Sequence, residues 1–337
     1  MSFIIISVLS GAIYINSIGN EFVFDDLFQV VENYDIRGFQ NITKILGVGK
    51  EWLRYRPVRE ISYCIDYTFS GLKPTAYHIS NIIYHTLSSF LLYLILINIT
   101  NNFTVSIFGA VLFATHPIHT EAVTYITGRK DVLSGMFFLM GFYFFILLRK
   151  SGDKKYIFFT FLSYVLGFFT KESVIILPAL FFIYDFFFVA DRKIKNLEKH
   201  KYFYLLFSAI ACLFAFSAVY RYEFSVKGYS AVLSYPSGNV YTNILTVIRI
   251  WVFYIKQLLL PIILNADYSF NAFPVARSLF EFNSFISVIL IIFVFYFIRK
   301  HSDDRIIIFS ASWFFITLIP VSRIIPHHEM VAERFLY

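Results

Sequence analysis

Ten long apolar runs, separated by short polar segments, constrain this chain more than any other feature. They occupy residues 3–18, 79–97, 104–116, 132–148, 156–170, 173–189, 202–219, 244–264, 282–298 and 306–321. A helix of about 20 apolar residues crosses ~30 Å of hydrocarbon. With 58% hydrophobic and only 15% charged residues, a soluble domain of this length would expose apolar side chains and aggregate. The sequence therefore predicts an all-α integral membrane protein with nine or ten membrane segments.

Three basic clusters between the apolar runs predict the orientation of the chain. They fall at 149–155, 192–201 and 299–305, and the positive-inside rule places them in the cytoplasm. Counting spans backward puts the amino terminus inside and the long segment 20–78 outside, with the polar segments after the third and fifth runs. The net charge of +7 follows this pattern and is not typical of a nucleic-acid-binding surface.

The eighth run, 244–264, does not fit this count as a simple crossing. It starts outside, yet the ninth run must also start outside because it ends at a basic cluster. We expect a re-entrant or interfacial segment, because Arg249, Lys256 and the Pro261 step interrupt the run. The alternative is a short crossing within 272–280.

Two adjacent acids, Asp25 and Asp26, follow the first apolar run by a few residues. Adjacent carboxylates suit a general base and a partner that orients it or holds charge. A solvated helix cap is the alternative when the pair is considered alone. The other polar groups on the same predicted side favour a functional site.

Three arginines lie close together in the long outer segment, at Arg54, Arg56 and Arg59. Guanidinium groups bind phosphate with planar, bidentate geometry, so this cluster could hold a lipid phosphate at the membrane surface. A simple headgroup contact, or pairing with Glu60 and Asp66, is the alternative.

The third apolar run ends in a dense polar cluster that includes His116, His119 and Glu121. This run has only about thirteen residues and does not reach across the bilayer, so these groups are predicted to line a polar cavity. A metal site is not favoured, because Pro117 breaks the helical spacing of the histidines. Substrate contact or a structural network is the preferred interpretation.

Two further ionisable groups border apolar runs. Arg129 or Lys130 could meet an anion at the turn that opens the fourth run, although Asp131 could instead cap that helix and pair with one of them. Lys171 and Glu172 lie so close to hydrocarbon that they mark either a site or a buried pair.

A last polar cluster falls outside by the same topology and either frames the cavity or belongs to a loop. It consists of His327, His328, Glu329, Glu333 and Arg334.

Six short motifs appear in the order found in a known family. They are Asn-x-Phe-Val-Phe-Asp-Asp, Tyr-Arg-Pro-Val, His-Pro-Ile-His-Thr-Glu-Ala-Val with Gly-Arg-Lys-Asp, Lys-Glu, Ala-Asp-Tyr-Ser and Ala-Glu-Arg-Phe-Leu-Tyr. From about residue 20 to 337, the chain resembles the membrane part of the transmembrane and tetratricopeptide-repeat-containing O-mannosyltransferases, including their prokaryotic relatives. The resemblance implies a GT-C multi-helix transmembrane domain over 1–337, with the family's last spans and repeats outside this sequence.

The resemblance also implies a reaction. A sugar, mannose in the animal members, would pass with inversion from a polyprenyl-phosphate carrier to a Ser or Thr hydroxyl of an acceptor protein. The site would face the extracytoplasmic side of the inner membrane in a prokaryote, or the lumen of the endoplasmic reticulum in a eukaryote. Asp25 would be the general base and Asp26 its companion.

Donor and substrate contacts are predicted for the remaining polar residues. Candidates for the donor phosphate are Arg56, Arg59, Arg129, Lys171 and Arg334. Candidates that line the substrate cavity are His116, His119, Glu121, Lys130 and Glu172. Because phosphate is a good leaving group, cationic side chains can take the place of a metal, and no cofactor is expected.

A different class of protein is the main alternative. A transporter or flippase for a lipid-linked sugar or an anionic lipid would use the same ionisable groups along its path. Transporters commonly carry inverted repeats, and this sequence shows none. A noncatalytic scaffold would leave the acidic pair unexplained.

Overall fold

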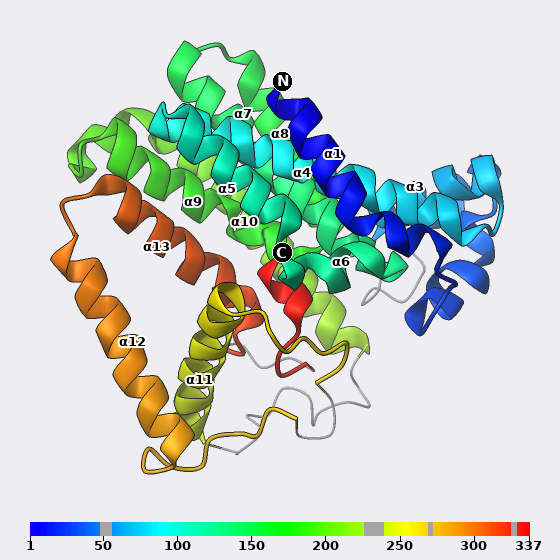
Figure 1. Cartoon of the computed structure of the whole chain (residues 1–337). Helices are drawn as coiled ribbons and strands as arrows, with labels where there is room; N and C mark the ends of the chain where they lie inside the picture. The colour runs from blue at the N-terminus through cyan, green and yellow to red at the C-terminus, as the bar shows by residue number, and fades with distance from the viewer. Residues whose placement is uncertain (48–55, 226–238, 269–271, 325–328) are drawn as a thin grey trace. The chain divides into compact units, whose positions relative to one another are not determined.

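The protein is described here by a computed structural model in which every regular element of the described residues is helical (Figure 1). The described residues are 1–47, 56–225, 239–268, 272–324 and 329–337, with the side chains of 217–225 excepted. They divide into two compact units, Met1–Leu177 with Tyr337 and Pro178–Leu336. Each of the ten apolar runs lies largely in helical residues, although the eighth run extends beyond its helix, which ends at Leu259.

The first unit contains the helices that carry most of the predicted site. They are α1 (Ser2–Tyr14), α2 (Ile42–Leu46), α3 (Pro57–Ser70), α4 (Pro74–Thr100), α5 (Phe103–Thr115), α6 (Thr120–Thr124), α7 (Arg129–Ser151) and α8 (Lys155–Phe168). Helix α3 lies within the long segment 20–78.

Local sequence signals set the ends of these helices. Pro74 lies in the first turn of α4, where its missing N–H costs nothing. Asn101, with a left-handed φ of 51°, ends α4, and the side chain of Asn102 accepts a hydrogen bond from Val105 N to begin α5. Gly152 (φ 73°) ends α7 in the same way. The chain therefore reverses sharply between neighbouring membrane helices.

Six of the described helical segments are long and apolar enough to cross a membrane. They are Ser2–Gly19, Pro74–Thr100, Ile126–Ser151, Glu172–Val189, Val240–Leu259 and Phe282–Lys300. Helix α5 and the short helices after it form a further candidate, bent by 45° at Pro117. The predicted break at this proline is confirmed, as is the multi-helix all-α membrane architecture.

Helices α4 and α7 form the centre of the first unit, with α1 and α5 against α4 and α8 against α7 (Figure 1). Small residues lie at two of these contacts. Gly109 of α5 faces Leu96 of α4, and Gly141 of α7 faces Ser163 of α8. Small side chains allow membrane helices to approach closely and pack by van der Waals contact.

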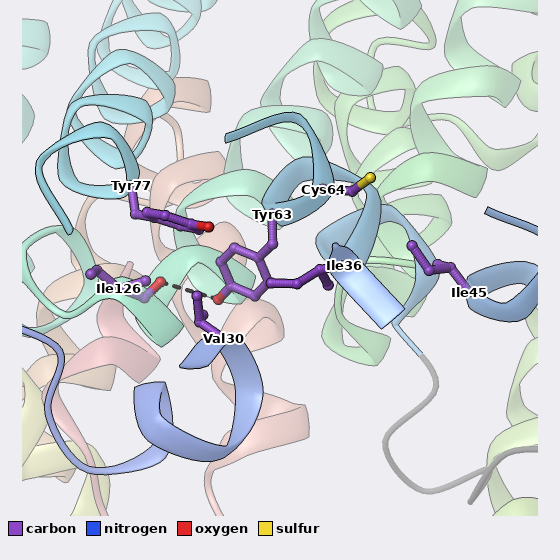
Figure 2. Packing of buried hydrophobic residues seen from close by; sticks show 7 residues of the cluster. All are labelled: Val30, Ile36, Ile45, Tyr63, Cys64, Tyr77 and Ile126. Carbon is purple, nitrogen blue, oxygen red and sulfur yellow. Dashed lines mark hydrogen bonds between the residues drawn. The ribbon is translucent and has the colours of Figure 1, made fainter. Parts of the chain in front are cut away.

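The outer segment folds onto this helical base through its own apolar core (Figure 2). The core residues are Val30, Ile36, Ile45, Tyr63, Cys64, Tyr77 and Ile126. Burial of one such side chain contributes about 1.5–3 kcal/mol, so the cluster fixes α3 against the chain that precedes α7.

The second unit contains α9 (Leu177–Tyr184), α10 (Lys201–Ser225), α11 (Val240–Leu259), α12 (Phe282–Lys300) and α13 (Arg305–Leu318). Helix α11 packs on α12. The predicted interruptions of the eighth run at Arg249 and Lys256 are wrong, because α11 continues past both, and Arg249 lies 3.8 Å from Glu281. The predicted interruption at the Pro261 step is confirmed, because α11 ends at Leu259. The alternative of a helical crossing within 272–280 is also wrong, since these residues form no helix. A re-entrant course for α11 stays a prediction.

Contacts between loops agree with the predicted sidedness within each unit. In the second unit, Arg192 donates to the carbonyls of Ser302 (2.7 Å) and Asp303 (3.0 Å), which brings two of the basic clusters together. In the first unit, Lys150 donates to the carbonyl of Asn98 at 2.8 Å. These segments therefore share a side, as the charge pattern predicts.

The turn that opens α7 leads to a prediction about stability. A Cβ atom at Gly128 would lie 2.4 Å from the backbone oxygen of Ala122, which cannot move aside as a side chain would. We expect Gly128→Ala to lower the free energy of unfolding by about 1–3 kcal/mol. Thermal unfolding in detergent measures the change. Gly11→Ala is the control, because its Cβ meets nothing within 4 Å, and an equal effect of both substitutions would contradict the prediction.

Candidate functional site

The two adjacent acids lie in different surroundings. The carboxylate of Asp26, only 1% exposed, accepts hydrogen bonds from Val23 N at 3.1 Å and Thr127 N at 2.9 Å. Burial raises the pKa of Asp26, and these backbone hydrogen bonds oppose the rise. Asp25 is exposed. Asp26 therefore anchors the turn, while Asp25 is the acid that can reach a substrate.

Arg129 is fully buried at the start of α7, where its guanidinium joins three helices. It lies 2.5 Å from the carboxylate of Asp66 in α3 and donates to Asn81 Oδ1 (2.9 Å) and the carbonyl of Tyr77 (2.8 Å) in α4. The ring of Tyr63 stacks against it, with its centroid 4.6 Å from Cζ. Because the Arg129 side chain is fully buried, it cannot make the predicted contact with the donor phosphate.

Asn81 and Asp66 are buried polar partners of Arg129 that the sequence reasoning did not assign to a site. The side-chain amide of Asn81 also donates to the carbonyl of Tyr125 at 3.0 Å, so it fixes the chain ahead of α7. A signal was present, because an amide within an apolar span is costly unless it is bonded.

Lys171 and Glu172 pair with different partners, not with each other. Arg56 donates to both carboxylate oxygens of Glu172, at 3.0 and 3.1 Å, and Lys171 forms an ion pair with Asp131. The Arg56–Glu172 pair is accessible, with side chains 20% and 57% exposed. Lys171 is 12% exposed. Each ionisable group beside the apolar run is thus matched across helices.

Arg59 is buried within the outer segment. Its guanidinium bonds Glu60 at 3.1 Å through Nε, and it also donates to Gln29. Glu60 in turn accepts a hydrogen bond from Asn33 at 2.7 Å. Burial lowers the pKa of Arg59, but the Glu60 carboxylate more than compensates and the net pKa is raised. The pair therefore stabilises the fold of this segment.

These contacts converge on the first turn of α7. Thr127 binds Asp26 just before that turn, and Asp131 within it binds Lys171. The neighbouring Glu172 binds Arg56. Lys130 lies in the same turn and is partly exposed. The structure therefore brings together parts of the three polar segments, 20–78, 116–131 and 171–172, that the predicted topology places on one side.

The histidines of the third run lie in an aromatic cluster. His119 is buried, with its ring centroid 4.4 Å from that of Phe113, 5.0 Å from Tyr337 and 5.7 Å from His85. The Nδ1 of His116 accepts a hydrogen bond from Ile118 N and so caps the short helix that follows. His119 packs within the protein and offers little surface to a substrate.

Other predicted residues have mixed outcomes. Glu121 is partly exposed. Arg334 lies in the second unit, where it pairs with Glu329. Glu333, in the same unit, accepts hydrogen bonds from Asn265 N (2.6 Å) and the Tyr268 hydroxyl (2.9 Å). Arg54, His327 and His328 lie outside the described residues.

The part of the chain that the structure describes contains no group of three His, Cys, Asp or Glu placed to hold a metal ion. The fold and these contacts define a multi-pass helical membrane protein with an exposed acid and paired cations gathered at one end of its first unit.

Comparisons with known proteins then show what this chain is similar to. A family model described as dolichyl-phosphate-mannose-protein mannosyltransferase matches residues 67–221. A protein O-mannosyl-transferase of Caenorhabditis elegans, F38B6.6, is 25% identical over 99% of this chain and 49% of its own length. Protein O-mannosyl-transferase TMTC3 of Mus musculus is 36% identical over 41% of this chain and 16% of its own length. TMTC2 of Homo sapiens is 25% identical over 89% of this chain and 39% of its own length.

No solved structure matches the chain. The chain spans about half the length of the Caenorhabditis elegans relative and less of the others. These matches support the resemblance: the chain is similar to protein O-mannosyl-transferases over nearly its whole length, and its central part matches the mannosyltransferase family model.

The buried pair at Arg129 leads to a second prediction. Arg129→Met leaves the carboxylate of Asp66 buried without its cation, so we expect it to lower the free energy of unfolding by about 3–5 kcal/mol. Thermal unfolding checks this, and adding Asp66→Leu should restore part of the loss. Lys155→Gln, which removes an exposed pair with Asp153, should change little. A loss at Arg129 no greater than this control would refute the structural role.

Proposed function

We propose that this chain is the membrane part of a glycosyltransferase that moves a sugar from a polyprenyl-phosphate donor to a Ser or Thr hydroxyl of a protein. Mannose is the proposed sugar, because the matching family and the relatives carry mannosyltransferase names. The reaction is assigned to the extracytoplasmic side of the inner membrane or, in a eukaryote, to the lumenal side of the endoplasmic reticulum. The observation that carries the proposal is the turn that buries Asp26 and exposes Asp25.

The proposed step needs a base and a stabilised leaving group. The Asp25 carboxylate removes the proton from the acceptor hydroxyl as its oxygen forms a bond to the anomeric carbon. The bond between that carbon and the phosphate oxygen breaks on the opposite face, and its electron pair leaves with the lipid phosphate. The configuration at the anomeric carbon is inverted.

Among the predicted cations, Arg56 is the best placed for the donor phosphate. It is partly exposed, and no described residue accepts a hydrogen bond from its buried Nε. A phosphate could bind this guanidinium while Glu172 keeps its contact with Nη2. Lys171 is proposed to add positive charge at the phosphate, whereas the predicted phosphate contact of Arg334, which belongs to the second unit, stays a prediction. Arg59 and Arg129 are buried, and their proposed role is indirect: they hold the outer segment in place.

Substrate contacts are proposed for the partly exposed Lys130 and Glu121, together with His116 and the exposed Glu172. His119 supports this surface from the aromatic cluster. A metal is not required by the mechanism, because arginine and lysine can stabilise the charge that develops on the leaving phosphate.

The role of Asp25 is tested by Asp25→Asn, which keeps the shape of the side chain and removes its basicity. We expect transfer of labelled mannose from dolichyl-phosphate mannose to Ser- and Thr-containing peptides to fall by about 10²–10⁴-fold. Glu21→Gln removes another exposed acid of the same segment and should retain activity. Near-normal transfer by Asp25→Asn would refute the assignment.

The independence from metal is tested by chelation. We expect transfer to survive dialysis against excess EDTA, because the proposed stabilising charges are side chains. The measurement is the initial rate before and after dialysis, with rates in added Mg²⁺, Mn²⁺ and Ca²⁺ for comparison. Complete loss that one of these ions restores would show that the reaction needs a metal.

A further inference from the structure

The turn that carries Asp25 adopts a backbone conformation that its own sequence does not favour. Phe24 has a φ of 47°, in the left-handed region that bulky residues rarely occupy. The turn is closed by a hydrogen bond from Asp26 N to Val23 O at 2.9 Å. Such a conformation persists only when surrounding contacts determine it. The contacts that hold this turn therefore decide where the Asp25 carboxylate lies.

One of these contacts comes from Tyr125, a residue one hundred positions away in the sequence. The backbone N–H of Asp25 donates to the hydroxyl oxygen of Tyr125 at 2.9 Å. Burial raises the pKa of Tyr125, so its hydroxyl stays neutral and presents an oxygen to this N–H. Asp26 fixes the residue after Asp25 through Thr127 N, so the base is held from both sides by one short stretch of chain.

Tyr125 is itself firmly placed. Its carbonyl accepts hydrogen bonds from the amide of Asn81 and from Gly128 N, each at 3.0 Å. The next carbonyl, that of Ile126, accepts a hydrogen bond from the buried hydroxyl of Tyr63 at 3.2 Å (Figure 2). The phenol therefore extends from a backbone that is bonded to both α3 and α4.

We propose that Tyr125 is a positioning residue for the catalytic base. Its hydroxyl holds the Asp25 amide and so keeps the carboxylate at the distance that proton transfer requires. The inference rests on the proposed function, in which Asp25 is the base. A displacement of about 1 Å at a reacting group can cost about 10²-fold in rate, so the loss of this one contact affects turnover more than binding.

Tyr125→Phe removes only the hydroxyl oxygen and tests the inference in the full chain, reconstituted in lipid nanodiscs. We expect kcat for transfer from dolichyl-phosphate mannose to fall by about 10–100-fold, with KM for the donor nearly unchanged. Amide hydrogen exchange in the peptide that contains Asp25 should become faster, because its N–H loses a protein acceptor. A merely structural loss would instead lower the thermal midpoint and speed exchange throughout the unit.

Tyr164→Phe is the matched control, because the hydroxyl of Tyr164 also bonds backbone, at Ile175 O (3.3 Å), eleven residues along the chain and far in the sequence from the acidic turn. It should retain kcat and leave exchange at Asp25 unchanged. Unchanged exchange at Asp25 in Tyr125→Phe would overturn the contact. Faster exchange with the kcat of the control would overturn the positioning role.

The two proposals fail in different ways. If Asp25→Asn transfers mannose normally, the base is elsewhere and both proposals fall, whatever the exchange data show. If Asp25→Asn is inactive and Tyr125→Phe behaves like Tyr164→Phe, only the role of Tyr125 is rejected. If both variants lose turnover and exchange at Asp25 rises, both proposals stand.

Discussion

The buried ion pair between Arg129 and Asp66 is the interaction on which the polar end of the first unit depends. A guanidinium removed from water is costly unless its donors are matched. Asn81 and the carbonyl of Tyr77 complete the match at 2.9 and 2.8 Å. Because Asp66 comes from α3, the other two partners from α4 and Arg129 from α7, a single side chain joins the ends of three helices. The penalty for an unmatched charge gives this junction its specificity.

Asn81 extends this order from the junction to the acidic turn. The same side chain that binds Arg129 also holds the carbonyl of Tyr125, just before α7. From there, Tyr125 and Thr127 reach the amide of Asp25 and the carboxylate of Asp26. Asp25 is thus connected to the buried Arg129–Asp66 pair by the hydrogen bonds that Asn81 and Tyr125 make. Apolar packing positions whole helices, whereas these directional hydrogen bonds fix the backbone that carries one carboxylate.

The sequence was sufficient to predict the all-α multi-helix membrane fold, the break at Pro117 and the convergence of several polar segments, although it predicted nine or ten membrane segments where six of the described helical segments, or seven with the bent pair, are long and apolar enough to cross. Each of these follows from hydropathy, loop charge or backbone chemistry, which are local properties. Partner choice was not predictable in this way. Nothing in the sequence favoured Arg56 over Arg129 as a ligand for an anion. Only the fold shows that Arg129 is buried against Asp66, whereas Arg56 stays partly exposed. His119 similarly became part of an aromatic cluster, because Phe113 and Tyr337 meet it in space.

Adjacency explains why the acidic pair divides its tasks. Consecutive residues at a turn point in different directions, so one carboxylate can enter the protein while its neighbour faces outward. Asp26 accepts two backbone hydrogen bonds, and burial raises its pKa. An acid in that position serves geometry and is poorly placed to reach a substrate. Asp25 has the opposite environment, with its backbone bonded and its side chain exposed. In the proposed mechanism the pair acts as one anchored base, in which the buried acid supplies the rigidity that the exposed acid needs.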